Sequence, residues 1–378
     1  RAMQLISVKA ALGGKIESGT KVEVRGWVRT RRDSKAGISF VNVHDGSSQM
    51  PVQVVVPATL PNYQDGVLKL TAGASVADDT RRRVLEAADQ LGYRPNLMAR
   101  TLMTQRSKVV ALVMGHLRNP FFTNMLGLFN EQLRANGYQT LLQIVSADFG
   151  VEQAVEAALQ YQLDGILMAS CHPSAALAAR CHRYQLPIVA VDRTSDQNAS
   201  QIWIQSDALG KSIAARLLAD GRKRLAVIEG TPGEPLSRRS RSFMQCAQSA
   251  GVSLTIDYGG YYYEGGREAA ARLLRSASPP DAIFCLTDPM ALGAIDAARF
   301  DAAIRVPQDL SIIGCGDIPA AAWPSFDLTT ARLPLAEIVQ QSVATLLARI
   351  EDPTLRPEHL QLTCPIVERG TTLPRVER

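Results

Sequence analysis

The sequence predicts an α/β protein whose main part, from about Val109 to Thr371, forms two doubly wound parallel-sheet lobes. From Lys108 onward, short apolar runs alternate with longer amphipathic runs, which is the pattern of a parallel sheet with crossover helices. The alternation begins again near Leu225, so the pattern indicates two lobes of one architecture. Between Lys21 and Pro57 the hydrophobic period is instead two residues, which predicts a small antiparallel β segment before the lobes.

The same periods predict the individual elements. The first lobe is expected to contain strands at 109–114, 140–145, 165–169 and 187–191, and helices near Phe122–Asn136, Val151–Gln162 and Ser174–Tyr184. The second is expected to contain strands at 225–229, 281–286 and 310–314, and helices that include Ser237–Ala250 and Arg267–Ser276. A helix at Leu335–Ile350 and a strand at 359–368 complete the chain. Because ligands of open α/β sheets bind beyond the carboxyl ends of the strands, two facing lobes predict a ligand cleft.

Composition limits the class of protein. The 378 residues are 46% hydrophobic and 20% charged, which is enough for two or three domains. No apolar run is long enough to span a membrane, and no export signal is visible, so we expect a cytoplasmic protein with reduced cysteines. Cysteine pairs with zinc-site spacing, a glycine-rich phosphate loop and a nucleophile elbow are not found in the sequence. The sequence therefore predicts a binding protein, and neither an enzyme nor a metal or cofactor protein.

Basic residues cluster although the net charge is only +5. Seven Lys or Arg lie between Arg81 and Lys108 against two acidic residues, and a second cluster lies between Lys21 and Lys35. Such clusters are either solvated faces or nucleic-acid contacts, and charge alone does not choose between these two interpretations.

Several motifs in order resemble the LacI/GalR family of repressors over about Ser75 to Arg369. They are VADDTRRRVLEAADQLGYRPN, ARTLMTQRSKVVALVM, RNPFFTNMLGLF, TDPMALGAIDA, VPQDLSIIG and LTTARLP. The resemblance implies a periplasmic-binding-protein-like effector domain, a homodimer, and partners that are DNA and a small effector such as a sugar or sugar acid.

The resemblance also implies a set of effector-binding residues: Asn119, Phe121, Phe122, Asp192, Arg193, Arg239, Asp288 and Trp323. The alternative is that the aromatic residues are core and that Arg239 forms a surface ion pair. Where the family typically has Gly-aromatic-Asp-Asp, this chain has Gly314-Cys315-Gly316-Asp317. One aspartate that commonly contacts the effector is thus replaced by Gly316, so we expect a less hydroxylated or more acidic ligand.

The DNA-binding part departs from the family. Tyr93, Asn96, Ala99 and Leu102 match the hinge segment, whose leucine would enter the minor groove. A helix at Asp78–Leu91 matches the third helix of the headpiece, but the two preceding helices, including the one that reads the major groove, have no counterpart. We therefore expect that base-specific DNA recognition is impaired.

The first 74 residues resemble another family, the N-terminal anticodon-binding OB-fold of bacterial asparaginyl-tRNA synthetases. The match lies in GTKVEVRGWVRTRRDSKAGISFVNVHDGS, VQVVV and LPNYQDGVLKLT, and it implies RNA contacts by Arg32, Phe40 and Gln53. About three of the five strands of such a barrel are expected.

The expected domains are a partial OB-like β segment (1–74), a residual headpiece helix and hinge (75–107), a two-lobed effector domain (108–371) and a tail (372–378). The predicted function is a repressor-type, ligand-responsive regulator. The alternative is a chimeric or RNA-binding remnant of the synthetase without aminoacylation activity.

Overall fold

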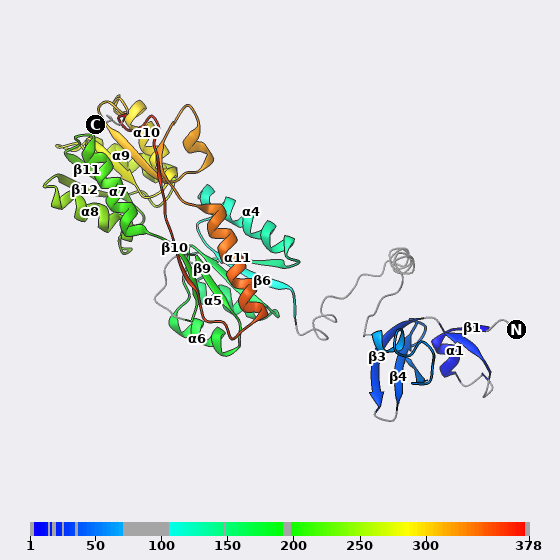
Figure 1. Ribbon diagram of the computed structural model, residues 1–378. Helices are drawn as coiled ribbons and strands as arrows, with labels where there is room; N and C mark the ends of the chain where they lie inside the picture. Colours follow the sequence, from blue (N-terminus) through cyan, green and yellow to red (C-terminus); the bar gives the residue numbers. More distant parts are fainter. Residues whose placement is uncertain are drawn as a thin grey trace. The chain divides into compact units, whose positions relative to one another are not determined.

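The computed structural model describes residues 4–13, 16, 20–24, 26–34, 37–70, 106–146, 148–191 and 198–374 (Figure 1). The chain divides into two units, Arg1–Asn96 and Leu97–Arg378. The expected headpiece helix and the hinge residues Tyr93, Asn96, Ala99 and Leu102 lie outside the described residues, as do Asp192 and Arg193.

The first lobe of the larger unit has a six-stranded parallel sheet. Its order is β16 (His359–Leu362), β10 (Ser200–Ile204), β9 (Ile188–Val191), β8 (Gly165–Ala169), β6 (Val109–Met114) and β7 (Gln139–Ile144). The central strands are apolar throughout because helices cover both faces. The helices α4 (Pro120–Ala135) and α11 (Leu335–Glu351) cover one face, and α5 (Val151–Leu159) and α6 (Ala175–Arg183) cover the other.

The second lobe repeats this architecture. Its sheet has the order β12 (Ser253–Tyr258), β11 (Arg224–Glu229), β13 (Ala282–Cys285), β14 (Ser311–Gly316), β15 (Thr329–Arg332) and β17 (Ile366–Val367), and only β17 is antiparallel to its neighbour. One face packs against α7 (Ser206–Ala219) and α8 (Arg238–Ser249), the other against α9 (Tyr263–Leu274) and α10 (Asp288–Asp296). The prediction of two doubly wound lobes is confirmed.

The chain crosses between the lobes three times. The crossings follow β10, β15 and β16, and they are tied together by hydrogen bonds. The Gln205 N–H donates to the Leu362 carbonyl (2.9 Å), and the Arg332 N–H donates to the Pro365 carbonyl (2.8 Å). The three crossings thus form a hydrogen-bonded hinge.

The expected single strand at 359–368 is wrong. Residues His359–Leu362 pair with β10 in the first lobe, and Ile366–Val367 pair with β15 in the second. Pro365 lies between the two strands, and proline lacks an N–H group and restricts the residue before it. A continuous strand is therefore broken at the crossing.

The smaller unit contains a three-stranded antiparallel sheet with the order β3 (Trp27–Ser34), β4 (Ile38–His44) and β5 (Val52–Pro57). A separate parallel pair joins β1 (Gln4–Ile6) to β2 (Val22–Val24), and α1 (Val8–Leu12) lies between these two strands in the sequence. Tyr63 and Val67, from the segment after β5, pack with Val28, Val41 and Val56 into a small core. One face of the sheet is therefore covered by its own following segment.

Candidate ligand-binding cleft between the lobes

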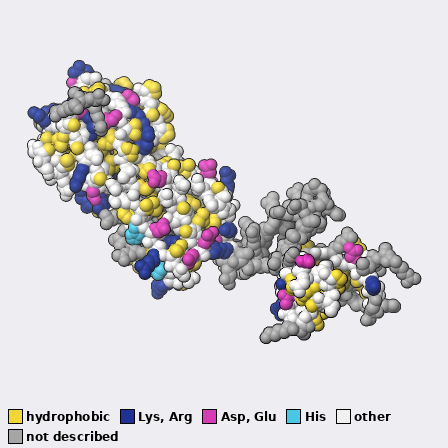
Figure 2. Space-filling view, viewed as in Figure 1, with side chains coloured by type: hydrophobic (Ala, Val, Ile, Leu, Met, Phe, Trp, Pro, Cys, Tyr) yellow, Lys and Arg dark blue, Asp and Glu magenta, His cyan; other side chains and the backbone are white. Residues whose placement is uncertain are grey.

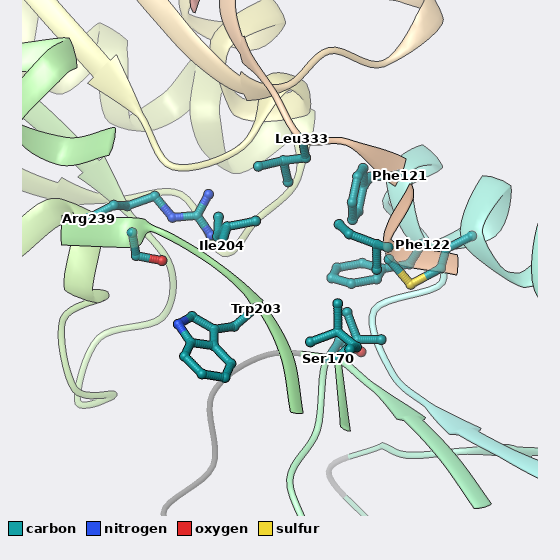
Figure 3. Close-up of a pocket in the computed structure, with 12 residues that line it drawn as sticks. Phe121, Phe122, Ser170, Trp203, Ile204, Arg239 and Leu333 are labelled. Atoms are coloured by element: carbon teal, nitrogen blue, oxygen red, sulfur yellow. The ribbon is translucent and has the colours of Figure 1, made fainter. Parts of the chain in front are cut away.

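A cavity lies between the two lobes, beside the hinge. Residues of both lobes and of the crossings line it, and Figure 3 shows their side chains converging on one space. The lining residues are Phe121, Phe122, Met125, Ser170, Val191, Ile202, Trp203, Ile204, Ser206, Arg239, Leu333 and Ile338. This is the place where the sequence predicts a ligand, beyond the strand ends of two facing sheets.

Asn119 positions the two phenylalanines by capping α4. Its side chain is only 3% exposed, and Oδ1 accepts a hydrogen bond from the Phe121 N–H (3.0 Å). Pro120 follows at the first position of the helix, where its missing N–H costs nothing. The rings of Phe121 and Phe122 then meet edge to face at 5.3 Å in the wall of the cavity. Asn119 thus contributes to the cavity by fixing the start of α4, which carries the two phenylalanines. Phe121 packs in the core and also lines the cavity.

Arg239 projects into the cavity from the first turn of α8. Its Nη1 donates a hydrogen bond to Cys315 Sγ (2.7 Å), at the end of β14. Burial raises the pKa of the Cys315 thiol, which favours the neutral thiol beside the guanidinium. The neighbouring Arg238 instead pairs with Asp207 (2.5 Å) on the partly exposed side of the helix. Of the two adjacent arginines, Arg239 is thus the one that faces the ligand space.

A close contact between α7 and α8 holds Arg239 in place. A Cβ atom added to Gly210 of α7 would lie 2.0 Å from the Arg239 carbonyl oxygen and 3.0 Å from the Phe243 nitrogen. The helices therefore approach each other at a point where only glycine fits. Gly210 therefore helps to fix the position from which Arg239 projects into the cavity.

Asp288 does not line the cavity, in contrast to the expectation. It is fully buried at the start of α10, where Oδ1 accepts from Thr330 Oγ1 (2.5 Å) and Oδ2 from the Ile318 N–H (2.8 Å). Burial raises the pKa of this carboxyl group to about 6. In this conformation Asp288 joins β15 to the loop after β14.

The departure at Gly314-Cys315-Gly316-Asp317 has a structural basis. Gly316 has a φ of 142°, and a Cβ there would approach Asp288 Oδ2 to 3.2 Å. Asp317 forms ion pairs with Arg332 (2.5 Å) and Arg369 (2.6 Å). Neither of these two positions places a carboxylate in the lining of the cavity.

Trp323 lies elsewhere, and another tryptophan takes the place expected for it. Trp323 is 55% exposed and is not part of the cavity lining, whereas Trp203 of β10 is. The run SQIWIQ gives little periodic signal for this, because Ile202, Trp203 and Ile204 are consecutive apolar residues after a polar start. Of the expected residues in the described part of the chain, the structure brings Phe121, Phe122 and Arg239 together.

The lobes also touch beyond the second lobe's β12, at the sheet edge farthest from the hinge. The rings of His116 and Tyr261 lie 5.1 Å apart, edge to face. The Arg118 guanidinium lies 4.3 Å from the centre of the Tyr262 ring, and it is 3.7 Å from Glu264. A cation over an aromatic ring at an exposed site contributes about 0.5–1 kcal/mol. Separating the lobes at these contacts therefore needs little free energy. A ligand can enter the cleft only if the lobes separate in this way.

In the smaller unit, the three expected RNA-contacting residues lie on one face of the sheet. Arg32 pairs with Phe40 across β3 and β4, and Gln53 pairs with Asn42 across β4 and β5. Since alternate residues share a face, Arg32, Phe40 and Gln53 point to the same side, opposite Val41 and Val56 of the core.

The surface of the two lobes carries charges of both signs. On the face in view in Figure 2, Lys and Arg side chains are spread over both lobes and alternate with acidic ones. Among the described residues, we find no helix with the length and hydrophobicity that a bilayer crossing requires.

Comparison with known proteins shows similarity to regulators over most of the chain. Residues 214–372 match the model of a periplasmic binding protein-like domain. The ribose operon repressor of Haemophilus influenzae is 30% identical over 302 residues, which are 78% of this chain and 90% of that protein. The solved complex of the transcriptional regulator CelR with cellobiose is 26% identical, with a TM-score of 0.62, over 79% of this chain and 92% of that one.

The N-terminal segment is similar to a different protein. The asparagine–tRNA ligase of Myxococcus xanthus is 72% identical over 74 residues, which are 20% of this chain and 16% of the ligase. The match therefore covers a small part of an enzyme, and it does not extend to most of that enzyme's length.

Proposed function

This chain belongs to the LacI family of transcriptional regulators, and from that premise we propose that it is a repressor-type regulator which binds a small metabolite in the interlobe cleft. The observation that carries the proposal is the cavity beside the hinge, in which Arg239, Phe121 and Trp203 converge from both lobes and a crossing strand. One relative is named for the ribose operon and another was solved with cellobiose, so a sugar or sugar acid is the ligand proposed here. Its place of action is the cytoplasm, where DNA is available.

A ligand between the lobes changes their relative orientation because it contacts both at once. The hinge holds the lobes through three crossings, while at the far edge the described residues include weak contacts such as Arg118 over Tyr262. A ligand that binds one arrangement better than the other shifts the population towards it. The readout of the regulator is then the relative orientation of its two lobes.

DNA binding by this chain is expected to be weakly selective. The sequence retains the basic set between Arg81 and Lys108 and the hinge leucine Leu102, but it has no counterpart of the reading helix. Phosphate contacts supply affinity without sequence information, whereas selectivity needs contacts with base edges. A homodimer is part of the proposal, because a twofold protein matches a palindromic site.

Two measurements test the proposed function. Thermal denaturation with a panel of sugars, sugar acids and other organic acids should show a shift, since a ligand at about 100 times its Kd stabilises the folded state by about 2.7 kcal/mol. A panel without any shift would contradict the ligand site. Titration of a palindromic upstream duplex and a scrambled duplex at two salt concentrations should give similar, salt-sensitive affinities. Tight binding of the palindrome at the higher salt would contradict the expected loss of base-specific DNA recognition.

A second candidate function is single-stranded RNA binding by the smaller unit. It is favoured by the common face of Arg32, Phe40 and Gln53, and by the ligase similarity over 74 residues. An RNA oligomer should then bind with an affinity that Phe40→Ala lowers by about 1–3 kcal/mol. Equal binding by the Phe40→Ala variant would exclude this function.

A further inference from the structure

A second aromatic surface lies on the face of the three-stranded sheet that carries Phe40. The rings of Trp27 and His44 lie 5.1 Å apart across β3 and β4, with an interplanar angle of 34°. His44 follows Phe40 by four residues in β4, so both side chains point to the same side, about 13 Å apart along the strand. Trp27 is 41% exposed, although burying an indole removes a large apolar surface from water. The face thus presents two separate aromatic surfaces to solvent.

A β-bulge in β3 turns Trp27 to this face. In a regular strand, Trp27 and Thr30 would point to opposite sides, because alternate residues share a face. The register shifts between Val28 and Thr30, which leaves Arg29 as the extra residue, and Trp27 pairs with His44. Val28 points to the other side and packs in the small core. The bulge therefore places the indole outside the core, beside His44.

The turn after β4 orients the two rings. The Gly46 N–H donates a hydrogen bond to His44 Nδ1 (2.9 Å). Gly46 has a φ of 82°, and a Cβ there would lie 3.5 Å from Cη2 of the Trp27 indole, so the backbone of the turn lies close to this ring. Both rings thus have a defined orientation in the folded sheet. A stacking surface of this kind loses less conformational entropy on binding than a mobile one.

The charges of the sheet favour a negatively charged ligand on this face. The strands β3, β4 and β5 contain one acidic residue, Asp33, and it points to the opposite face. There it accepts a hydrogen bond from Ser39 Oγ (2.6 Å) and pairs with Arg31 (3.0 Å). Arg29 and Arg32 are exposed. Polar side chains lie between the two aromatic surfaces, and they are Thr30, Asn42 and Gln53.

We propose that the Trp27–His44 pair is a second base-stacking site for a single-stranded nucleic acid, on the same face as Phe40. Bases of any sequence stack on aromatic rings, and the phosphates between them are attracted by exposed arginines. In other RNA-binding domains, aromatic residues on a sheet stack two or three bases of one strand. This inference rests on the second candidate function, and it adds a site that the ligase resemblance does not imply.

The fluorescence of Trp27 reports stacking directly. The chain has three tryptophans, so the full chain with Trp203→Phe and Trp323→Phe retains Trp27 as its single tryptophan. The probes are hexaadenylate RNA, the DNA hexamer of the same bases, and AMP. The RNA hexamer should quench the emission of Trp27, and it should bind at least about ten times more tightly than AMP, which occupies one surface at a time. Quenching by the DNA hexamer as well assigns the site to single strands in general, whereas quenching by RNA alone adds recognition of the 2′-hydroxyl group. An RNA hexamer that binds without quenching Trp27 would overturn the inference.

Variants separate the second site from the first, with the fluorescence anisotropy of a labelled RNA hexamer as the readout. Trp27→Ala should weaken binding by at least about fivefold, and Trp27→Phe, which keeps a ring, should recover most of this loss. Val54→Ala removes an exposed apolar side chain from the opposite face and is the matched control, so it should bind like the wild type. If Trp27→Ala does not fold, His44→Ala tests the same pair.

The outcomes distinguish the second site from RNA binding as such. Equal affinities of the Trp27→Ala and Val54→Ala variants, with a weaker Phe40→Ala variant, would overturn the second site and leave the candidate function in place. No binding of any strand would overturn both. An emission of Trp27 that changes with protein concentration, and not with nucleic acid, would assign the pair to a contact between copies of the chain and would also overturn the inference.

Discussion

Gly210 offers a direct test of how the helix packing positions Arg239. In the Gly210→Ala variant, the new Cβ would lie 2.0 Å from the Arg239 carbonyl oxygen, which is about 1.5 Å short of ordinary contact. Backbone atoms form this contact, so no side chain can rotate away, and α8 must move. Overpacking of this kind costs about 1–3 kcal/mol, while alanine in place of glycine in a helix gains up to about 1 kcal/mol. We expect a net loss of about 1–2 kcal/mol.

Gly127→Ala is the matched control. Gly127 also lies inside a helix, α4, but a Cβ there would meet nothing within 4 Å. This variant should be more stable than the wild type by up to about 1 kcal/mol. Equilibrium unfolding in urea measures both, and the two variants should shift the midpoint in opposite directions. If Gly210→Ala stabilises the protein as Gly127→Ala does, the contact between α7 and α8 is not tight and our account of Arg239 is wrong.

Three further predictions concern buried charge and the smaller unit. Burial raises the pKa of Asp288 to about 6, above its ordinary 3.8, so the folded state holds this proton more tightly than the unfolded state. The contribution of Asp288 to the free energy of unfolding is therefore largest below about pH 4 and is lost as the pH rises through 6. In the Asp288→Asn variant, the free energy of unfolding measured in urea should no longer change with pH over this range. Arg216 is buried between Asp220 and Glu368, so Arg216→Met should lower the free energy of unfolding by about 3–5 kcal/mol. Arg305→Met, at an exposed pair, should lower it by less than about 1 kcal/mol. Similar losses for the two variants in urea unfolding would contradict the role given to burial. Amide exchange of residues 38–44 should be fast, because a three-stranded sheet with a small core is marginally stable, and strong protection would contradict this.

The sequence predicted the strands whose apolar runs are buried on both faces, such as Val109–Met114 and Gly165–Ala169. It did not predict β10, because that strand begins with polar residues whose partners come from distant parts of the chain. Ser200 Oγ accepts from the Glu358 N–H (3.0 Å) and lies 3.3 Å from Arg349 Nη1, which comes from α11. Such burial of a polar strand is set by tertiary contacts, and periodicity does not reveal it.

The candidate site was predictable to a similar extent. Phe121, Phe122 and Arg239 were found because the resemblance to the LacI/GalR family implies effector contacts at these positions, which lie at the starts of two helices. Trp203 was missed together with its strand β10. Asp288 was expected at the ligand, because sequence alone does not show that Thr330 and Ile318 hold both of its oxygens.

The three crossings also determine how this protein can be dissected. The first lobe takes residues 106–204 and 335–362, and the second takes 206–333 and 366–374, so neither is encoded by one continuous stretch of the gene. A fragment that ends before Leu335 lacks α11 and β16 of one lobe and β17 of the other, and it exposes apolar faces of both. Deletion series, domain swaps and split-reporter fusions must therefore respect all three joins, and a single cut between the lobes would yield insoluble halves rather than working modules.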